Sequence, residues 1–331
     1  MKILYSKSLT TTELTDSGDK VYGQLVHQLT DGGVAVAKGL KTVPEVLAFQ
    51  LLGQAGVVDT IRDCLGNSKR NGFILAGGNV SWFGRRSYVS DQDQLPILKI
   101  LPMGTVQILA GFIANRIGKF NYISSDATSC ISSMSALYTA NLLLSANELD
   151  QVVILSVDNS LAPEYLKIFG ENKITKSLAE ESDPNCQKVH LGQGVNVTIV
   201  SKNGKNALAN VKGCSVTAEQ HNSPLGMNPA GEGYRTAMRN AMRAADVDKY
   251  GINFIKAHST NTEDNMIEAI VIKELFGNPK VVSYKHLFGH TMGASGLIEI
   301  EAAISEHKYG RFLANSSGMG NVFASAVVEI L

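Results

Sequence analysis

The sequence predicts a duplicated α/β architecture, and three observations support this. Short, continuously apolar segments with strand character alternate with longer segments that have helical spacing of apolar residues. Because these strand segments are apolar at nearly every position, we expect them in sheets that are covered on both faces. The alternation continues after a polar, glycine-containing stretch at 201–204, so we expect two halves of similar make-up, 1–204 and 205–331.

Both halves contain the same kinds of element. In the first half, the spacing predicts helices at 43–65, 103–117 and 131–146, and strands at 73–76, 151–157 and 195–200. In the second half, we expect helices at 234–245, 265–276 and 296–306, and strands at 207–216, 252–257, 281–284 and 323–330. The polar segment 167–190 interrupts the alternation and is expected to be a surface excursion.

The composition limits the class of protein. The chain has 331 residues, 30 Lys plus Arg against 30 Asp plus Glu, and 44% hydrophobic residues. This apolar content suffices for a core and excludes a disordered, coiled-coil or collagen-like chain. The balanced charge argues against a general nucleic-acid binder, which needs an excess of Lys and Arg facing phosphates. Charged residues make up only 18%, which favours a large core or a buried subunit interface.

The cysteines and the apolar runs indicate a cytoplasmic protein. We expect reduced thiols and no metal site, because no CxxC pair or zinc-ligand spacing occurs among the four cysteines, which are Cys64, Cys130, Cys186 and Cys214. No stretch reaches the roughly 18 uninterrupted apolar residues that a membrane-spanning helix requires. The first 20 residues resemble neither a signal peptide nor a membrane anchor, so no membrane association is expected.

A cysteine flanked by small residues begins a strongly helical run. Cys130 lies in DATSCISSMSAL at 126–137. A thiol at the start of a helix lies near the positive end of the helix dipole, which lowers its pKa and favours the nucleophilic thiolate. Cys130 is therefore a candidate nucleophile. Buried free cysteines are common, so a purely structural cysteine is the competing interpretation of this segment.

Two histidines follow predicted strands, in the loops that lead to the next helices. His258 lies in FIKAHSTNT at 254–262, and His290 lies in VVSYKHLFGHTMGASG at 281–296. Catalytic side chains are often carried just past strand ends. Small residues after His290 allow the backbone to pack closely around its imidazole. For His258, a hydrogen bond that caps the loop is the alternative interpretation.

In this order and with these neighbours, the three segments resemble the β-ketoacyl synthases, the condensing enzymes of the thiolase superfamily. TSCISS at 128–133 is similar to the family's Thr-Ala-Cys-x-Ser-Ser pattern, and HSTNT at 258–262 to its His-Gly-Thr-Gly-Thr segment. SYKHLFGHTMGASG at 283–296 is similar to Ser-x-x-Lys-x-x-x-x-Gly-His-x-x-Gly-Ala-x-Gly, with one fewer residue before the lysine. The resemblance covers most of the chain from about Gly77 onward and implies a thiolase-like, duplicated αβαβα layered fold with two mixed sheets.

The resemblance implies a role for each matching residue. Cys130 is expected to carry an acyl chain as a thioester. His258 and His290 are expected to stabilise the enolate that forms when a malonyl thioester loses carbon dioxide. Lys285 is expected to pair with Glu268 and to help fix the two histidines.

The stretch NSSGMGN at 315–321 resembles the family's C-terminal glycine-rich loop. In that reading, the amide of Met319 and the amide of Cys130 would hold the oxyanion that forms at the thioester. The remaining supporting positions in the matching segments are Thr260, Thr262, Gly318 and Gly320.

Function and partners also follow from the resemblance. It implies an acyltransferase that forms carbon–carbon bonds by decarboxylative Claisen condensation, in fatty acid, polyketide or polyene synthesis. No cofactor is implied, because the phosphopantetheine of an acyl carrier protein presents the substrates. The expected partners are that acidic carrier and a second ketosynthase-like chain, in a homodimer or a heterodimer. Four basic residues are candidate contacts for the carrier, although such residues also serve solubility: Lys69, Arg70, Arg85 and Arg86.

The chain departs from the family pattern in several places. Met319 replaces the phenylalanine that gates the loop, Gln193 replaces a glutamate between two glycines, and Ser259 and Asn261 replace glycines after His258. The part before the cysteine is also shorter than is usual for the family. These departures keep open a non-catalytic or chain-length-determining partner subunit. An acyltransferase that uses the cysteine without decarboxylation is the third possibility.

Overall fold

In the part of the chain that the structure describes, ten strands form one mixed sheet. The computed structural model describes residues 1–10, 48, 51–66, 68, 70–77, 106–160, 169–171, 188–189, 191–204, 206–223, 226–262 and 264–331. The first five strands are β1 (Lys2–Thr10), β2 (Asn71–Ala76), β3 (Tyr122–Asp126), β4 (Gln151–Asn159) and β5 (Gln193–Ser201). The other five are β6 (Ala209–Ala218), β7 (Phe254–Lys256), β8 (Lys280–Val282), β9 (Gly310–Gly318) and β10 (Val322–Ile330).

The strand order of the first half is repeated in the second. The sheet runs β3-β2-β4-β5-β1-β6-β10-β9-β7-β8. Each half has three parallel strands followed by two antiparallel ones. Within the sheet, as far as the chain is described, the halves are joined by two residue pairs between β1 and β6, Lys2 with Asn210 and Ile3 with Ala209. The expectation of two separate mixed sheets is therefore corrected, because this short pairing joins them into one.

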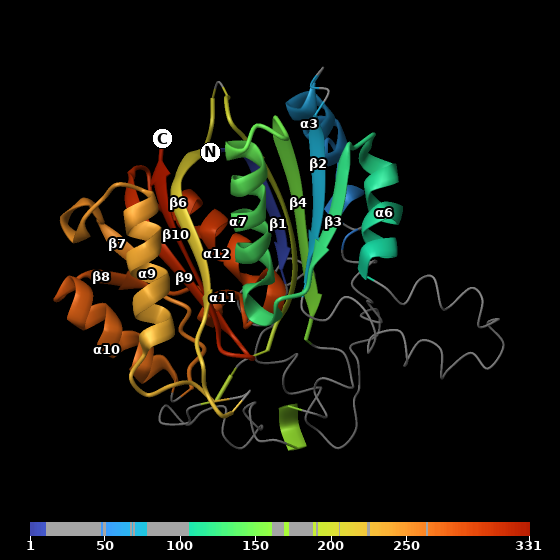
Figure 1. Ribbon diagram of the computed structural model, residues 1–331. Coiled ribbons are helices and arrows are strands. Elements are labelled where there is room, and N and C mark those ends of the chain that lie inside the picture. Colours follow the sequence, from blue (N-terminus) through green and yellow to red (C-terminus); the bar gives the residue numbers. More distant parts are fainter. Residues whose placement is uncertain are drawn as a thin grey trace.

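Two helices lie between the halves and touch both of them (Figure 1). Helix α7 (Ser132–Ser145) contacts β2, β3 and β4 on one side and β6 and β10 on the other. Helix α12 (Ser295–Glu306) contacts β1 and β5 as well as β7 and β9. These contacts require the sheet to turn at the β1–β6 joint around the helix pair.

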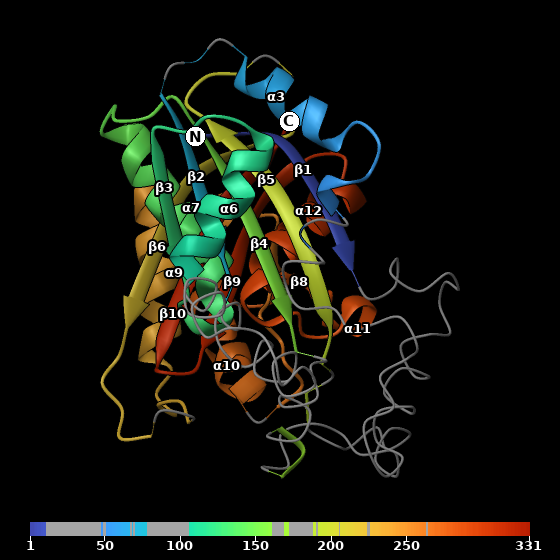
Figure 2. The ribbon, with the colours of Figure 1, turned by 90° about the vertical axis from the view of Figure 1, so that its right-hand side faces the viewer.

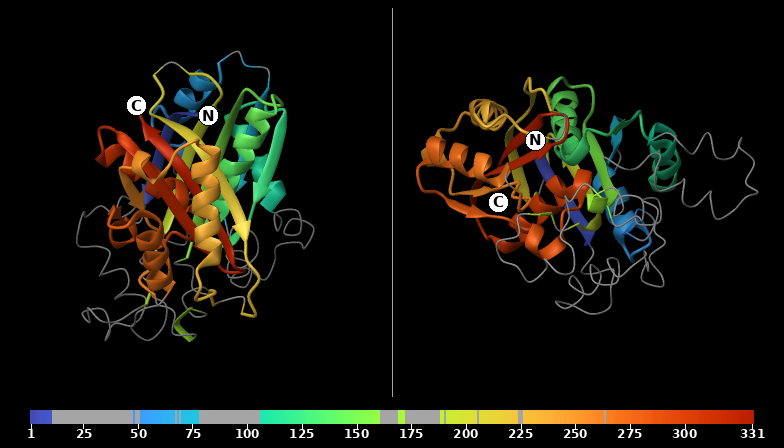
Figure 3. Two further views of the ribbon diagram at one scale, coloured as in Figure 1. Left: turned by 60° about the vertical axis from the view of Figure 1, so that its left-hand side comes forward. Right: turned by 90° about the horizontal axis from the view of Figure 1, so that it is seen from below.

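Further helices cover the outer faces. Figure 2 shows α3 (Val57–Leu65) and α6 (Val106–Ile117) in front of the first-half strands. Figure 3 shows α9 (Glu232–Ala244) beside the second-half strands, with α10 (Asp264–Phe276) next to it. The layers therefore follow the predicted αβαβα order.

Strand alternation divides the apolar side chains between these layers. In β2, Phe73 and Leu75 pack with Ile113 of α6, whereas Ile74 and Ala76 pack with α7 in the central layer. A third cluster lies between α9 and the second half. Burial on both faces explains why the strands are apolar at nearly every position.

Most predicted elements are confirmed, with ends that shift by a few residues. The predicted helix at 43–65 is interrupted: Ala48, Leu51 and Leu52 are helical, a turn that contains Gly56 at φ 78° follows, and α3 runs from Val57 to Leu65. Residues 43–47, 49 and 50 lie outside the described residues. The start of the predicted helix at 103–117 and most of the predicted excursion at 167–190 lie outside the described residues.

Strands β1, β3 and β9 and the short helix α11 (Lys285–Phe288) were not predicted from the sequence. Strand β1 was not predicted because part of its inward face is polar, so the strand has no continuous apolar pattern. Ser6 Oγ lies 2.8 Å from Thr198 Oγ1, and Ser8 Oγ accepts a hydrogen bond of 3.1 Å from Asn196 Nδ2. Glu301 of α12 completes this buried network. Apolar periodicity therefore fails to detect the strand that joins the two halves.

The close packing of α9 on β6 gives a test of the fold. A methyl group added at Gly213 of β6 would lie 2.5 Å from the backbone nitrogen of Ala245 and 2.6 Å from the oxygen of Ala241. Neither backbone atom can rotate away, so Gly213→Ala should lower the free energy of unfolding by about 2 kcal/mol, measured by urea denaturation.

Gly111→Ala in α6 is the matched control. No atom lies within 4 Å of the added methyl group, and alanine favours the helix, so stability should rise by up to about 1 kcal/mol. Equal effects of the two substitutions would contradict the packing of α9 on β6.

Candidate active site

Cys130 lies in a sharp turn between β3 and α7. The turn is the 3-10 helix η1 (Ser129–Ile131), and Ser129 has φ +51°, in the left-handed region that non-glycine residues rarely adopt. The Cys130 side chain is 6% exposed. The nucleophile candidate is thus held at the start of a buried helix, as predicted.

The second half repeats this turn. The 3-10 helix η4 (Met292–Ala294) leads into α12, and Met292 has φ +47°. Ser132 Oγ donates to the Ser129 oxygen at 2.6 Å, and Ser295 Oγ donates to the Met292 oxygen at 2.8 Å. The two turns contact each other, which brings His290 to the same end of the helix pair as Cys130.

The two predicted histidines meet at this end of the molecule. His258 follows β7, and His290 lies between α11 and η4; their ring centroids are 5.4 Å apart, with an interplanar angle of 83°. Each side chain is 4% exposed, and within the described residues neither Nδ1 atom has a hydrogen-bond partner. Burial, followed by the charge of Lys285, holds the pKa of both imidazoles well below the usual range. Both are therefore neutral at pH 7 and can donate one N–H each.

The backbone at His290 is fixed by the first half. Gly192 N donates to the His290 oxygen at 3.0 Å, and Ser160 Oγ donates to the same oxygen at 3.2 Å. A methyl group at Gly192 would lie 2.2 Å from the Phe288 oxygen. This close approach explains why a glycine precedes Gln193. Gly293 N donates to the buried carboxylate of Asp158 at 2.9 Å and fixes the next turn.

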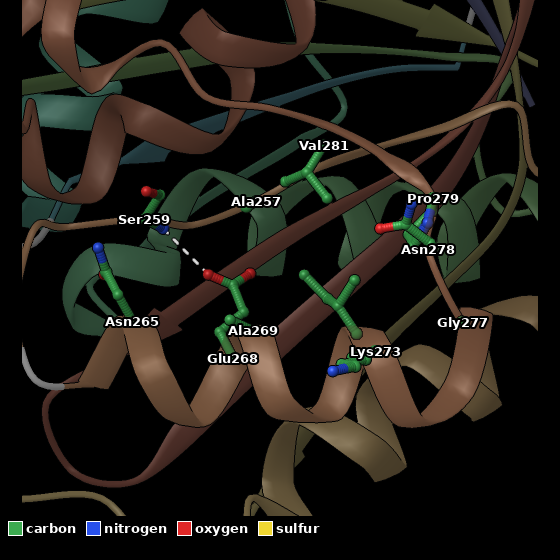
Figure 4. A pocket seen from close by; sticks show the side chains of 11 residues that line it. Ala257, Ser259, Asn265, Glu268, Ala269, Lys273, Gly277, Asn278, Pro279 and Val281 are labelled. Carbon is green, nitrogen blue, oxygen red and sulfur yellow. Dashed lines mark hydrogen bonds between the residues drawn. The ribbon is translucent and has the colours of Figure 1, made fainter.

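A buried carboxylate holds the loop after His258. The amides of His258 and Ser259 donate to the two oxygens of Glu268 at 2.8 and 3.0 Å; Figure 4 shows the second contact. Ser259 has φ +45° and Asn261 φ +61°. These are the positions where the family pattern has glycine, so the chain keeps the backbone shape at the cost of local strain.

Two predicted supporting residues order the same loop. The hydroxyl oxygens of Thr260 and Thr262 lie 2.9 Å apart, and Thr260 Oγ1 donates to Asn265 Oδ1 at 3.3 Å. Neither threonine carries charge toward the imidazoles, so their role here is to shape the loop.

Lys285 pairs with Glu299, which corrects the predicted pairing with Glu268. The Lys285 ammonium donates to Glu299 Oε1 at 2.6 Å, and Lys256 donates to Glu299 Oε2 at 2.7 Å. Lys256 is 0% exposed, and Glu299 is 2% exposed. One carboxylate thus lies between two buried ammonium groups, and the charges of both lysines act on the two histidines.

Asn315 connects this charge cluster to Glu268. Its backbone oxygen accepts from Lys256 at 2.7 Å, and its Nδ2 donates to Glu268 Oε1 at 3.3 Å. Burial raises the pKa of Glu268, and burial likewise lowers the pKa of Lys285.

Lys256 and Glu299 were not predicted as site residues, and Asn315 was predicted only as the first residue of the C-terminal loop. A usable signal existed: Lys256 and Glu299 are charged residues inside otherwise apolar segments, the strand FIKA and the helix GLIEIEAAI.

Burial dominates the chemistry of the thiol. It raises the pKa of Cys130 to about 11, so the predicted lowering by the helix start is wrong for the resting protein. Cys130 packs in a small apolar cluster with Phe169, Val189, Leu191 and Met292. This dry surrounding disfavours the thiolate more than the helix start favours it.

The predicted C-terminal loop is shorter than expected. Residues 315–318 belong to β9, and only 319–321 form a turn, in which Gly320 has φ +87°. A methyl group at Gly318 would lie 3.1 Å from the amide nitrogen of Cys130, so this position must be small. Met319 is 38% exposed and does not belong to the apolar cluster around the thiol.

The basic residues predicted to contact a carrier protein are mostly outside the described residues. Of the four basic residues considered as contacts for a carrier protein, only Arg70 is described, and its guanidinium donates to Asp150 and to the Asn147 oxygen.

A hollow of about 350 Å³ lies between α10 and the β7–β8 edge (Figure 4). Cys130, His258, His290 and Lys285 do not line it. Within the described ranges, no cluster of metal-ligating side chains and no helix long and apolar enough to cross a bilayer is found.

Comparisons with known proteins agree with the arrangement. Residues 208–315 match the family model described as Beta-ketoacyl synthase, C-terminal domain. The chain is 26% identical to the highly reducing polyketide synthase ALT1 of Alternaria alternata, over 70% of this chain and 10% of that protein. It is 26% identical to the chloroplastic 3-oxoacyl-[acyl-carrier-protein] synthase II of Arabidopsis thaliana, over 63% of this chain and 42% of that protein. These matches span less than half of each curated relative.

Solved structures share the fold. The complex of the ketosynthase ApeO with its chain length factor ApeC from Xenorhabdus doucetiae has a TM-score of 0.76 at 18% identity, covering 100% of this chain and 98% of the matched one. A type II polyketide ketosynthase bound to its acyl carrier protein has a TM-score of 0.75 at 17% identity, covering 87% and 85%.

The raised pKa of Cys130 predicts slow alkylation. With a pKa of about 11, about one Cys130 thiol in ten thousand is ionised at pH 7. Iodoacetamide should therefore modify the half-buried Cys64 first, as followed by peptide mass spectrometry. The Cys130 rate should climb about tenfold per pH unit from pH 7 to pH 10. Faster labelling of Cys130 with a plateau below pH 8 would contradict the burial argument.

Removing the Glu299 charge should destabilise the fold. Glu299→Gln leaves two buried ammonium groups without a counter-charge, so the free energy of unfolding should fall by about 3–5 kcal/mol in urea denaturation. The control is Glu274→Gln, whose carboxylate is 45% exposed and pairs with Arg235 at the surface; it should cost at most about 1 kcal/mol. Similar losses in both variants would mean that the buried pairs do not form.

Proposed function

We propose that the chain is a divergent relative of the β-ketoacyl synthases of the thiolase superfamily and a condensing enzyme that joins an acyl thioester to a malonyl thioester. One observation carries the proposal: a buried thiol and two buried, neutral imidazoles lie at the same end of a helix pair. Such a site can form a covalent acyl intermediate and can also stabilise an enolate.

In the first step, Cys130 takes the acyl group. Its sulfur bonds to the thioester carbon, and the thiol of the carrier's phosphopantetheine leaves with the proton that Cys130 loses. The tetrahedral oxyanion would be held by the amide of Cys130 and by the amide of Met319. The close approach at Gly318 supports this placement, because it brings the β9 end beside the Cys130 amide.

In the second step, the malonyl thioester loses carbon dioxide. The bond to the carboxylate carbon breaks, and its electron pair forms an enolate whose negative charge lies on the thioester oxygen. N–H groups of His258 and His290 would stabilise this oxygen. Because both imidazoles are neutral, they do not strongly stabilise the carboxylate that must be lost, and their stabilisation acts mainly on the transition state.

In the third step, the enolate carbon attacks the Cys130 thioester and forms the new carbon–carbon bond. Cys130 leaves as a thiolate and takes up a proton, which its pKa of about 11 favours. The high pKa thus returns the enzyme to its resting thiol after each cycle.

The proposed partners are an acyl carrier protein, whose phosphopantetheine presents both substrates, and a second ketosynthase-like chain. Solved relatives form complexes of both kinds, one with a carrier and one with a chain length factor. We therefore expect assays of this chain to need a carrier-bound substrate rather than a free thioester.

A second candidate is a chain-length-determining partner subunit. The match to a complex of a ketosynthase with its chain length factor, which covers the whole of this chain, favours it. The exposed Met319, in place of a gating phenylalanine, also fits a subunit without its own turnover. The presence of the thiol and of both histidines argues for catalysis.

Intact-mass analysis tests the proposal. After incubation with an acyl carrier protein thioester, the wild-type protein should gain the acyl mass, and Cys130→Ala should not. Cys64→Ala is the matched control and should gain the same mass as the wild type. With malonyl carrier protein added, His290→Ala should release carbon dioxide about 10²–10³ times more slowly while it still becomes acylated.

Two outcomes would decide against the proposal. If the wild-type protein gains no acyl mass, alone or with a ketosynthase partner, the chain is not a condensing enzyme. If turnover appears only with a partner ketosynthase and is retained in Cys130→Ala, the chain is a chain-length-determining partner subunit.

A further inference from the structure

We propose that Lys256 is a positioning residue of this site, which holds Glu299 between two ammonium groups and sets the charge beside both imidazoles. The residue lies on β7, two positions before His258. The predicted effect of Lys256 on turnover rests on the proposed condensing function. The predicted effect of Lys256 on the protonation of the two histidines does not rest on that function.

The contacts of Lys256 join three elements. Its ammonium donates to Glu299 Oε2 of α12 at 2.7 Å and to the Asn315 oxygen of β9 at 2.7 Å. The side chain is 0% exposed. Burying an ammonium costs several kcal/mol before its partners compensate, so an apolar residue would serve a merely structural strand at least as well. A lysine at this position therefore points to a role for its charge.

Each oxygen of Glu299 has its own lysine. Lys285 donates to Oε1 at 2.6 Å, and Lys256 donates to Oε2. Without Lys256, Oε2 would be buried without its donor, and the carboxylate would rotate or draw Lys285 toward it. Lys285 is the charge with the largest effect on both histidines, so its displacement would reach them.

The charge of Lys256 acts on both imidazoles. Lys256 on β7 and Lys285 on α11 both disfavour the imidazolium forms of His258 and His290, because each is a like charge in the same buried surrounding. The buried carboxylates of this end of the molecule are Asp158 on β4, Glu268 on α10 and Glu299 on α12, and the Cys130 thiol lies there as well. Removal of Lys256 takes away one of the two positive charges and leaves the carboxylates in place, which favours the imidazolium forms.

A protonated imidazole would weaken the second step of the proposed reaction. An imidazolium attracts the malonyl carboxylate strongly and so stabilises the ground state that decarboxylation must leave. Transfer of the acyl group to Cys130 involves no malonyl carboxylate. Loss of Lys256 should therefore slow decarboxylation selectively, and more so at low pH.

The test compares two substitutions. Lys256→Gln removes the charge but keeps a hydrogen-bond donor, and Lys256→Met removes both. Lys308→Met, at an exposed lysine, is the matched control. Proton uptake by His258 and His290 is followed by NMR of the ¹³C-labelled imidazoles in the full chain, with the signals assigned from His258→Gln and His290→Gln.

In wild-type protein and in Lys308→Met, neither imidazole should take up a proton between pH 7.5 and pH 5.5. In both Lys256 variants, the titration midpoints should move up, so that proton uptake becomes visible within this range. Unchanged midpoints in the Lys256 variants would overturn the proposal, as would wild-type behaviour of Lys256→Gln alone, which would make hydrogen bonding sufficient. Failure of both variants to fold would also overturn it, because Lys256 would then be a structural residue.

Turnover provides the second measurement. Both Lys256 variants should release carbon dioxide from malonyl carrier protein more slowly than wild type, and the ratio of the two rates should grow as the pH falls from 7.5 to 5.5, with acylation of Cys130 within about twofold. Equal losses in both steps would contradict the proposed selectivity. Absence of carbon dioxide release from the wild type would instead count against the proposed function, and the NMR titration would still decide the role of Lys256.

Discussion

The buried carboxylate of Glu299 is the group on which the rest of the site depends. It accepts from Lys256 and Lys285, and through them it ties α12 to β7, β9 and α11. A buried charge of this kind is tolerable only with its partners in place. The two histidines lie beside this cluster, so their neutral state depends on burial and on the same lysines. The fold and the electrostatics of the site therefore share one set of contacts.

The duplicated architecture explains why this site forms between the halves. Each half delivers one left-handed residue, one short 3-10 turn and one long helix into the central layer. The first copy carries Cys130, and the second follows directly after His290. Because α7 and α12 are neighbours in one layer, the two turns must meet. The repeat therefore brings the Cys130 turn and the turn that follows His290 to the same end of the helix pair.

Much of the fold and of the candidate site was predictable from the sequence. The features that were not predicted each have a physical explanation. Apolar periodicity located the buried helices and most strands, and local patterns around Cys130, His258 and His290 located the site. Strand β1 was missed because polar residues face inward there. The partner of Lys285 was misassigned, because Glu299 and Glu268 are both buried carboxylates and only the packing of α12 chooses between them. The direction of the Cys130 pKa was wrong because a helix start can be read from sequence, whereas the depth of burial cannot.

The central claim is that two neutral imidazoles hold the thioester oxygen of a malonyl group while Cys130 holds the acyl chain. The most direct measurement is a crystal structure with a malonyl-pantetheine analogue in which an amide replaces the thioester. We expect the carbonyl oxygen of the analogue within hydrogen-bond distance of both His258 and His290, with its carboxylate turned away from them. A carbonyl that contacts neither imidazole, or a carboxylate bound between the two, would contradict it.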